Sequence, residues 1–342
     1  MATIKDVARL AGVGLGTASR VVSGKGSVSP ATHERVRKAI EQLGFKPSHA
    51  ARALLTGSTQ MIGVYIPILK DTFYTPILQL IDTELRAAGL HMVVAFGVGL
   101  GDAHRQAVEG IQFLLERGCD GLIAFTDQLT DRDIAVLGPK QDRLVVLNHR
   151  SGLIADLCFT VDHRHGGVLA ARTLLEHGHR KIAVIAGPAS ASDNVERING
   201  FLDELALAGI DSRKLWIVES DFSPEGGYAA ASSLLESGTS FTALFCANDA
   251  MAVGALSRFQ EQRIEVPRQV SVIGYDDTPS AEFSAPRLTT VRIPWRDVAQ
   301  SGVNALLNRC YGGERPVVQD FPISVTRRAS VAPARTTDAA AA

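Results

Sequence analysis

The sequence lacks the features that mark membrane-spanning, secreted and disulfide-stabilised proteins. No apolar run reaches the ~20 residues that a membrane-spanning helix requires, and no hydrophobic signal region follows the first basic residues. Only four cysteines occur, without CxxC or other metal-ligand spacing and mostly within apolar runs: Cys119, Cys158, Cys246 and Cys310. We therefore expect a cytoplasmic protein whose cysteines are reduced core residues.

Enzyme signatures are absent as well. Neither GxGxxG nor GxxxxGK[ST] occurs, and GVGLG at 97–101 lacks the later glycine, so we interpret it as a loop. No catalytic pair of carboxylates stands out, because Asp276 and Asp277 would point to opposite sides of an extended segment. Four histidines in a loop and at a helix end have no further metal ligands, and we expect them to be solvated: His163, His165, His177 and His179. The sequence thus predicts no enzyme, no cofactor and no metal.

Residues 3–24, by contrast, carry a strong pattern of two short helices joined by a tight turn. The first helix has an apolar face at the i, i+3, i+4, i+7 spacing, and Gly12 ends it: Ile4, Val7, Ala8 and Ala11. The second, about Leu15–Ser23, would bury Ala18, Val21 and Val22 and leave Leu15, Gly16, Thr17, Ser19 and Arg20 outside. Such an outer face suits the major groove of DNA, although ordinary helical domains also contain helix pairs of this size.

Charge favours the DNA interpretation. Residues 1–60 contain nine Lys and Arg against three acidic residues, a balance of +6, whereas the whole chain carries −1 and the remainder therefore −7. A basic end on an acidic body is expected when only that end meets a polyanion.

A third helix and a linker follow. Ser29 and Pro30 are typical of a helix start, Val36, Ala39, Ile40 and Leu43 form an apolar face, and Gly44 ends the helix. In FKPSHAARALLTGS, Pro47 blocks continuation and Ser48 can cap a short helix at His49–Leu55. Because this segment has no core partner nearby in the sequence, we expect it to order on binding.

From Met61 onward, short apolar strands alternate with amphipathic stretches of helix length. The strands are MIGVYIPI, HMVVAFG, GLIAFT, RLVVLNH, KIAVIAG, LWIVESD, ALFCAND and VSVIGYDD. This alternation predicts parallel sheets covered on both faces, and the polar stretch CFTVDHRHGG divides the strands into two similar lobes. Ligands of such sheets bind beyond the carboxyl ends of the strands, where the sequence places Pro67, Asn148, Asn248 with Asp249, and Asp276 with Asp277.

The chain resembles the lactose repressor/galactose repressor (LacI/GalR) family of bacterial transcription regulators from Thr3 to about Pro333. The motifs that carry the resemblance are TIKDVARLAGV…TASRVVSG, KPSHAARALL, GHRKIAVIAGP, FCANDAMAVGAL, VSVIGYDD and PRLTTVRIP, and the galactose-repressor branch is nearest.

The resemblance implies an all-α helix-turn-helix headpiece and an α/β core of two Rossmann-like lobes of the periplasmic-binding-protein type. The expected divisions are a headpiece at 1–46, a hinge helix and linker at 47–60, a core at 61–333 and a disordered tail at 334–342. Within the core, one lobe would take 61–161 and 292–320 and the other 162–291 and 321–333, with crossovers near 161–163, 291–293 and 320–322. The whole tail after Arg328 lacks a leucine heptad for a four-chain bundle and is expected to be disordered.

By this resemblance the headpiece and hinge contact a pseudo-palindromic operator. Leu54 would wedge into the minor groove beside Ala53, and Leu15 and Gly16 would tune operator choice. The remaining DNA contacts expected are Lys5, Thr17, Ser19, Arg20 and Thr32. Gly14 stands where relatives usually have a Ser or Thr cap, so the second helix should lack a side-chain cap.

The resemblance also implies a small-molecule effector, expected to be a sugar, between the two lobes. Arg197 matches an arginine that binds effector oxygens, Asn248 and Asp276 match a polar pair, and Asn148 is a further candidate. Phe73, Phe222 and Trp295 match positions where rings cover the ligand. Ile68 departs from the acidic residue that many sugar-binding relatives carry after Pro67.

These residues predict a homodimeric repressor of carbohydrate-utilisation genes that binds double-stranded operator DNA and no membrane. Two other functions fit parts of the sequence. A sugar-binding transport protein would share the two lobes but would need a secretory signal and would not need the basic headpiece. A catabolite-control regulator would instead take a phosphorylated carrier protein as its partner.

Overall fold

The N-terminal residues form three helices with the predicted ends. In the computed structural model, which describes residues 2–24, 26–45, 57–69, 73–98 and 101–335, the helices are α1 (Ile4–Ala11), α2 (Leu15–Ser23) and α3 (Pro30–Leu43). Thr3 caps α1 through a reciprocal bond with Asp6, and Ser29 caps α3, with its hydroxyl oxygen accepting from the amide of Thr32. Gly14 precedes α2 without a side-chain cap, as its lack of a side chain predicts.

The three helices have a small core of their own. Val7, Ala11, Val36 and Ala39 are buried together, and Ala18 from α2 is also fully buried. Val21 and Val22 are only half-buried, so the inner face of α2 is less enclosed than the sequence pattern indicates. The predicted hinge helix at His49–Leu55, which includes Ala53 and Leu54, lies outside the described residues.

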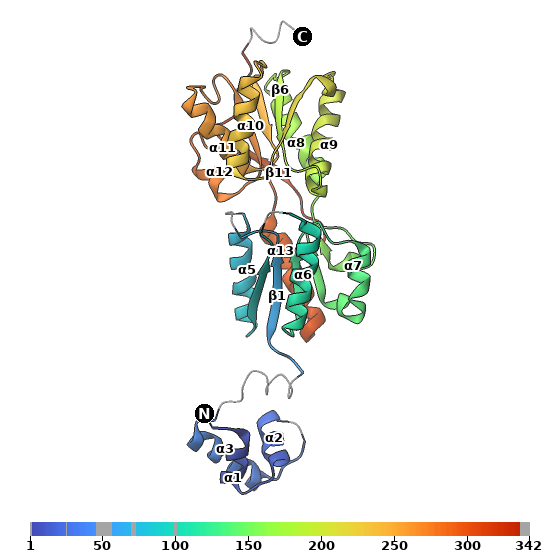
Figure 1. Ribbon diagram of the computed structural model, residues 1–342, viewed down its shortest axis with the longest axis vertical. Coiled ribbons are helices and arrows are strands. Elements are labelled where there is room, and N and C mark those ends of the chain that lie inside the picture. Colours follow the sequence, from blue (N-terminus) through green and yellow to red (C-terminus); the bar gives the residue numbers. More distant parts are fainter. Residues whose placement is uncertain (1, 25, 46–56, 70–72, 99–100, 336–342) are drawn as a thin grey trace.

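The first lobe contains a parallel sheet in the order β2-β1-β3-β4-β5 (Figure 1). Its strands are β1 (Met61–Ile66), β2 (His91–Phe96), β3 (Gly121–Phe125), β4 (Leu144–Leu147) and β5 (Cys158–Phe159). The helices that accompany it are α5 (Tyr74–Ala87), α6 (Ala103–Glu116), α7 (Asp131–Val136) and, from the distant end of the chain, α13 (Trp295–Tyr311).

The second lobe contains a sheet in the order β11-β10-β9-β8-β6-β7. Its strands are β6 (Ile182–Ala186), β7 (Trp216–Glu219), β8 (Ala243–Cys246), β9 (Ser271–Asp276), β10 (Thr289–Arg292) and β11 (Ser324–Thr326). Its helices are α8 (His163–Glu176), α9 (Ser192–Leu207), α10 (Pro224–Glu236), α11 (Asp249–Glu261) and α12 (Pro279–Phe283).

All eight predicted strands are confirmed, and three short strands were not predicted. β5, β10 and β11 have only two to four residues each, too few for the apolar patterns that identified the others. The expectation of wholly parallel sheets is wrong for β11, which pairs antiparallel with β10 from Thr290 to Arg292. The chain between β10 and β11 includes α13, but α13 packs on the first lobe, so the two strands are not joined by a helical crossover on their own sheet.

The predicted disordered tail is also wrong for the residues that the structure describes. Ser330 is fully buried, and its hydroxyl donates to the carbonyl of Val272 at 2.6 Å and accepts from the amide of Thr289. The amide of Ala334 donates to the carbonyl of His177 at 2.8 Å. The segment through Arg335 therefore packs against the second sheet although its composition is that of a tail.

The core contains no disulfide among the described cysteines, in agreement with the prediction. Cys158 and Cys246 are buried, whereas Cys119 and Cys310 are half-buried, and all four are free thiols. No helix in the described part of the chain is long and apolar enough to cross a membrane.

Helices of the second lobe pack in pairs that depend on glycine. α8 lies on α9 and α10 lies on α11 (Figure 1). A Cβ atom added to Gly200 of α9 would lie 1.9 Å from the carbonyl oxygen of Arg164 in α8, and one added to Gly254 of α11 would lie 1.9 Å from that of Pro224. The backbones approach so closely that only hydrogen fits at these positions.

Replacing Gly200 by Ala should therefore push α9 away from α8. We expect the free energy of unfolding to fall by about 1–3 kcal/mol, because backbone atoms cannot yield as a flexible side chain does. Urea denaturation of the full chain measures this, with Gly152→Ala as the matched control, since nothing lies within 4 Å of a Cβ there. Equal stabilities of the two variants would contradict this account of the packing.

Candidate functional site

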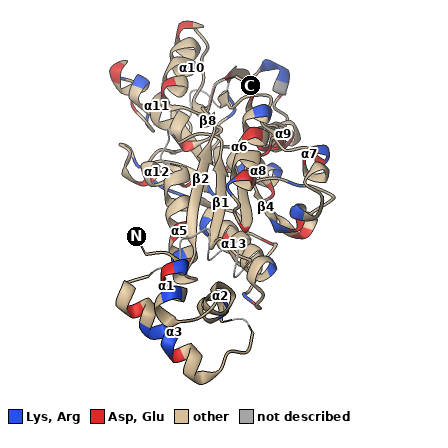
Figure 2. Cartoon of the chain, turned by 60° about the horizontal axis from the view of Figure 1, so that its bottom comes forward, with Lys and Arg blue, Asp and Glu red and all other residues tan. Residues whose placement is uncertain are grey.

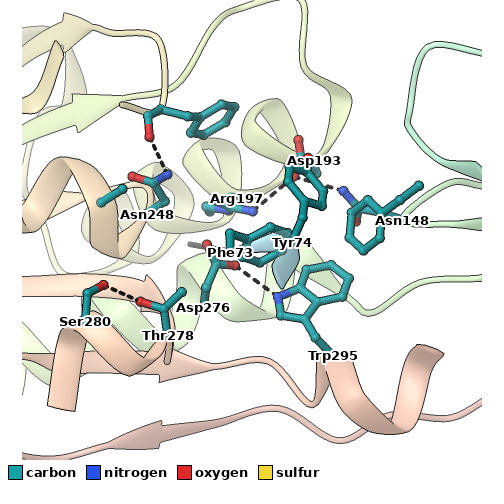
Figure 3. A pocket seen from close by; sticks show the side chains of 13 residues that line it. Phe73, Tyr74, Asn148, Asp193, Arg197, Asn248, Asp276, Thr278, Ser280 and Trp295 are labelled. Atoms are coloured by element: carbon teal, nitrogen blue, oxygen red, sulfur yellow. Dashed lines mark hydrogen bonds and ion pairs between the residues drawn. The ribbon is translucent and has the colours of Figure 1, made fainter. Parts of the chain in front are cut away.

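All seven residues predicted to bind a small molecule lie around one cavity between the lobes. Its volume is about 100 Å³ and Figure 3 shows its walls. The predicted residues are Phe73, Asn148, Arg197, Phe222, Asn248, Asp276 and Trp295. The cavity is also lined by residues that the sequence did not single out: Tyr74, Phe125, Asp193, Ala250, Thr278 and Ser280.

Three of the lining residues have left-handed backbones at or just beyond the carboxyl ends of strands. Asn148 follows β4 with a φ of 63°, Phe222 follows β7 with a φ of 65°, and Asp276 ends β9 with a φ of 105°. Such conformations are costly for residues other than glycine and gather at binding sites, where the surrounding structure maintains them. Each one turns the chain sharply where the strand stops, so that the side chain reaches the cavity.

Arg197 supplies the only cation among the described residues of this cavity. Its side chain is 2 % exposed; Nη2 donates to Oδ2 of Asp193 at 3.1 Å, and Nη1 donates to the carbonyl of Ala247. The guanidinium carbon lies 3.8 Å from the ring centre of Tyr275. Nε has no hydrogen-bond partner among the described residues, which leaves one buried donor for a ligand or water.

Asp193 and Arg197 form an ion pair one helical turn apart on α9. Burial raises the pKa of Asp193, but the Arg197 charge and the hydrogen bonds from Asn148 and the Asn194 amide together outweigh burial, so the net pKa lies below its ordinary value. Burial likewise opposes the charge of Arg197, yet Asp193, Tyr275 and Asp276 together raise its pKa overall. Both groups are therefore charged at neutral pH.

A chain of hydrogen bonds joins this ion pair to the other lobe through Asn148. The amide nitrogen of Asn148 donates to Oδ2 of Asp193 at 3.2 Å, so its Oδ1 must accept from Nε2 of His163, 2.7 Å away. A neutral imidazole has one N–H, so Nδ1 accepts from the hydroxyl of Tyr275 at 3.1 Å. These contacts form a closed ring, which we call the interlobe ring. It consists of Asn148, Asp193, Arg197, Tyr275 and His163.

His163 corrects one prediction. We expected solvated histidines, but His163 and His179 are each only 2 % exposed. Burial, and then the nearby Arg197 charge, lowers the pKa of His163 to about 3, which keeps the imidazole neutral. His179 is enclosed by the hydroxyls of Thr242 and Ser271 and the carbonyl of Ala332. No group of metal-ligating side chains occurs among the residues that the structure describes.

Asp276 differs from Asp193 in the direction of its pKa shift. Desolvation raises the pKa of Asp276 well above its ordinary value, and the indole Nε1 of Trp295 donates to its Oδ1 at 3.3 Å. Behind it, the wholly buried Asp249 accepts from Thr290 and Thr278, and desolvation raises its pKa to about 7. Asp277 is absent from the cavity lining, and its Oδ1 accepts from Nη2 of Arg328 at 2.7 Å; the backbone at Asp276 and Asp277 is left-handed and not extended as expected.

Asn248 also has a structural role. Its Oδ1 accepts from the amide of Met251 at 2.8 Å and so caps α11, and its amide nitrogen donates to the carbonyl of Phe222 at 2.9 Å. The second N–H of this amide group is left to donate to a ligand.

Aromatic rings form the opposite wall of the cavity. Phe73 packs edge-on against Tyr74, Phe125 and Trp295, with ring centres 4.9, 5.7 and 5.5 Å away. Phe222 lies against Gly187, where an added Cβ atom would be 2.2 Å from the ring. Because the rings are packed edge to face, they give this side of the cavity an apolar wall.

A second cavity of about 450 Å³ adjoins the first and contains Pro67 and Ile68 in its lining. Both cavities share Tyr74, Phe125, Asn148, Asp193, Phe222 and Ala250. Asp127 of the first lobe, which lines this second cavity, accepts from the amide of Ser192 at 2.7 Å. Ser192 is the first residue of α9. A negative carboxylate at a helix N-terminus is favourable, so this contact also holds the lobes together.

The cavity residues that the sequence analysis did not identify differ in whether a sequence pattern could have indicated them. Asp193 lies four residues before Arg197, a spacing that places both on one helix face and could have revealed the ion pair. Tyr74 and Phe125 carry no such sign, because a lone aromatic residue beside a strand is ordinarily a core residue. The partners of His163 are contributed by segments up to 112 residues away, which no local pattern predicts.

The headpiece presents a second candidate site. Leu15, Gly16 and Arg20 are exposed on α2, and Thr17 and Ser19 are half-buried on the same helix. Figure 2 shows Lys and Arg on the headpiece helices. On α3 Arg37 pairs with Glu34 and Glu41, whereas Lys5, Arg20 and Arg35 have no carboxylate partner in the described part of the chain. Near the start of α3, the hydroxyl oxygen of Thr32 accepts a hydrogen bond from the hydroxyl of Ser29 at 2.9 Å.

Comparisons with known proteins agree with this division into headpiece and core. Residues 3–48 match the profile of the bacterial regulatory proteins of the lacI family, and residues 171–331 match that of the periplasmic binding protein-like domain. The chain is 32 % identical to the HTH-type transcriptional regulator GalR of Escherichia coli (strain K12), over 97 % of this chain and 96 % of that protein.

Solved structures show the same similarity. A LacI-family transcriptional regulator from Burkholderia phymatum is 50 % identical over 80 % of this chain and 99 % of its own, with a TM-score of 0.77. The lac repressor dimer bound to operator and the anti-inducer ONPF gives a TM-score of 0.80 at 28 % identity, covering 97 % and 99 %. A complex of the regulator CelR with cellobiose gives 0.68 at 30 % identity, covering 96 % and 100 %.

Three observations lead to the same conclusion: similarity to GalR over nearly the full length, a helix-turn-helix headpiece, and a two-lobed core with a cavity between the lobes. The chain belongs to the LacI family of DNA-binding transcriptional regulators with an effector-binding core, a family without enzymatic activity.

Proposed function

We propose that this protein is a homodimeric repressor of carbohydrate-utilisation genes whose operator affinity is controlled by a sugar or sugar derivative in the cavity between the lobes. The observation that carries the proposal is the composition of the cavity wall, which combines one ion pair, one further carboxyl and two amides with a face of aromatic rings. It rests also on similarity to a family in which CelR binds cellobiose.

The chemistry of this wall suits an uncharged polyhydroxylated ligand. Adjacent sugar hydroxyls both donate and accept, and Arg197, Asp193 and Asp276 between them offer donors and acceptors. The charges of Arg197 and Asp193 cancel, so no net charge remains to attract an anion. The rings of Phe73 and Trp295 would cover the C–H face of the ligand.

The proposed DNA surface lies on the headpiece and the linker. We assign base and phosphate contacts to Lys5, Leu15, Gly16, Thr17, Ser19, Arg20 and Thr32. The minor-groove wedge is assigned to Leu54, with Ala53 as its small neighbour at the DNA. Arg20 supports this role because it is exposed and its guanidinium can bond guanine bidentately once it leaves the carbonyl of Gly16, 3.2 Å away. A palindromic operator requires two such surfaces, which is why we propose a homodimer.

Arg20→Ala tests the DNA surface. The full-length protein first selects a duplex from a randomised pool, and fluorescence anisotropy then measures affinity for that duplex. We expect a loss of about 1–3 kcal/mol, the value of one bidentate arginine–guanine contact. Arg132→Ala, an exposed arginine on the core, is the matched control. Unchanged affinity for Arg20→Ala would remove this residue from the interface.

Thermal unfolding tests the effector. D-galactose, D-ribose and cellobiose are each added to the full chain, and a sugar at one hundred times its Kd should raise the free energy of unfolding by about 2.7 kcal/mol. Arg197→Lys keeps the charge but not the planar fork, so it should lose most of that shift, whereas the exposed Arg180→Lys should keep it. A full shift with Arg197→Lys would argue against this site, and no shift with any sugar would argue against these ligands.

The interlobe ring predicts a pH dependence of stability. His163 has a pKa of about 3 in the folded protein, so below its ordinary value of 6.5 only the unfolded chain takes up the proton. The neutral histidine therefore contributes fully to the free energy of unfolding above pH 6.5. This contribution is lost as the pH falls, and the free energy of unfolding should drop by about 2 kcal/mol between pH 7 and pH 5. Denaturant unfolding of wild type and His163→Gln at both pH values gives this difference.

His91→Gln, at the exposed start of β2, is the control for removal of a histidine. It should leave the pH dependence as in the wild type. A wild-type pH dependence in His163→Gln would show that His163 is not the buried neutral group that the ring requires.

A further inference from the structure

Asp120 accepts four of the hydrogen bonds that attach the segment just before β1 to the core; Thr59 also donates to the carbonyl of Gly118, and the carbonyl of Gln60 accepts from the amide of His91. Oδ1 of Asp120 accepts from the amide of Thr59 at 2.8 Å and its hydroxyl at 3.0 Å, and Oδ2 accepts from the hydroxyl of Ser58 at 2.5 Å and the amide of Gln60 at 2.9 Å. Gln60 itself has a left-handed backbone with a φ of 57°. This segment is the core end of the linker that comes from the DNA-binding headpiece.

The same carboxylate is tied to the end of a helix. The hydroxyl of Tyr311, the last residue of α13, donates to Oδ2 of Asp120 at 2.6 Å, and the thiol of Cys310 donates to the Asp120 carbonyl at 3.4 Å. Partial burial raises the pKa of Asp120, but the hydrogen bonds from Ser58, Tyr311 and Thr59 outweigh it and lower the pKa overall. Asp120 therefore accepts these bonds as a carboxylate at neutral pH.

The other end of that helix lies in the cavity between the lobes. Trp295, the first residue of α13, lines the cavity and donates to Asp276 of the second lobe. α13 has 17 residues, so Trp295 and Tyr311 are about 25 Å apart along the axis. One helix thus spans the first lobe from the cavity to the attachment of the linker (Figure 1).

α13 is packed too tightly to bend between its two ends. An added Cβ atom on Gly302 would lie 2.8 Å from Leu147 of β4, and one on Gly121 of β3 would lie 2.6 Å from the sulfur of Cys310. Most of the helix between these points is buried, from Val298 to Leu307. Because close-packed interiors transmit a displacement and do not absorb it, a shift at Trp295 moves the helix as a unit.

We propose that Asp120 and Tyr311 are positioning residues that couple the cavity to the linker, with α13 as the connecting element. The inference rests on the cavity assigned above but not on the identity of the sugar. A change at Trp295 displaces α13, Tyr311 moves with it, and the hydrogen bonds that Asp120 accepts from residues 58–60 strengthen or weaken. The linker then presents the headpiece to DNA with a changed geometry.

A merely structural attachment would predict something different. In that case Asp120 would only fix the start of β1, and changes at the two ends of α13 would act independently. Coupling predicts that they are not independent, and a double-mutant cycle measures this directly. The two chemical changes are small: Trp295→Phe removes the Nε1 donor, and Tyr311→Phe removes the hydroxyl while leaving the linker's own bonds to Asp120.

The measurement is hydrogen–deuterium exchange of the Thr59 and Gln60 amides in the full-length protein, read by mass spectrometry without sugar or DNA. We expect Trp295→Phe to change exchange at these amides about tenfold although the two sites are about 25 Å apart. In the Tyr311→Phe background the same change should have less than a twofold further effect. Equal effects of Trp295→Phe in both backgrounds, or none in the wild-type background, would overturn the proposal.

The chain offers close controls for both substitutions. Tyr228 donates its hydroxyl to Glu261 at 2.5 Å, so Tyr228→Phe removes the same kind of bond elsewhere, and Trp216→Phe changes the other tryptophan, on β7. Neither should alter exchange at Thr59 and Gln60. Asp120→Asn is the second variant if Tyr311→Phe misfolds; it too should abolish the response to Trp295→Phe. Because no ligand is used, a failure of the sugar assignment would not affect this result.

Discussion

The buried guanidinium of Arg197 is the group on which the arrangement of the two lobes depends. A cation with only 2 % exposure is unstable unless charges and hydrogen-bond acceptors surround it, and here Asp193, the carbonyl of Ala247 and the ring of Tyr275 do so. Asp193 and Tyr275 are in turn joined to Asn148 and His163. Since Asn148 belongs to the first lobe and the others to the second, satisfying Arg197 also brings the lobes together. The ion pair therefore contributes a defined geometry more than stability.

The polar groups of the cavity already have hydrogen-bond partners within the protein, and this affects how a ligand can bind. Asn248 already bonds Phe222, Asp276 already bonds Trp295, and Asp193 already accepts from Asn148. A ligand that replaces one of these bonds gains only the difference between its own hydrogen bond and the one it replaces. Bonds to Nε of Arg197, which has no partner among the described residues, or to the second N–H of Asn248 replace none. Binding is thus linked to the contacts that relate the lobes, because two of the three bonds cross between them. A ligand that bound without disturbing these bonds would have no means of shifting the arrangement.

The sequence was sufficient for the elements and for much of the site, for a physical reason. In parallel α/β sheets ligands lie at the carboxyl ends of strands, so Asn148, Asn248 and Asp276 could be placed together from the strand pattern. Asp193, His163 and Tyr275 were missed because their role depends on partners far along the chain. The ordered segment at Ser330 was missed likewise, since a small-residue tail gives no sign that it will pair with Val272 and Thr289. What local patterns predict is position within an element; they do not predict which elements meet.

The geometry of the first lobe explains why α13 is suited to connect its two edges. The cavity lies at the carboxyl edge of the sheet, and the linker enters at the amino edge, where β1 begins and Asp120 precedes β3. The strands between these edges are fixed to one another by their ladder of hydrogen bonds, so none can shift alone. A helix packed on the face of the sheet has no such ladder and can slide as a body when one end is displaced. Among the helices on this lobe, α13 has a cavity residue, Trp295, at its first position. Its last residue, Tyr311, donates to Asp120, the carboxylate that also binds the linker. It also enters from the second lobe through Arg292–Pro294, so a rotation between the lobes acts on the end that carries Trp295.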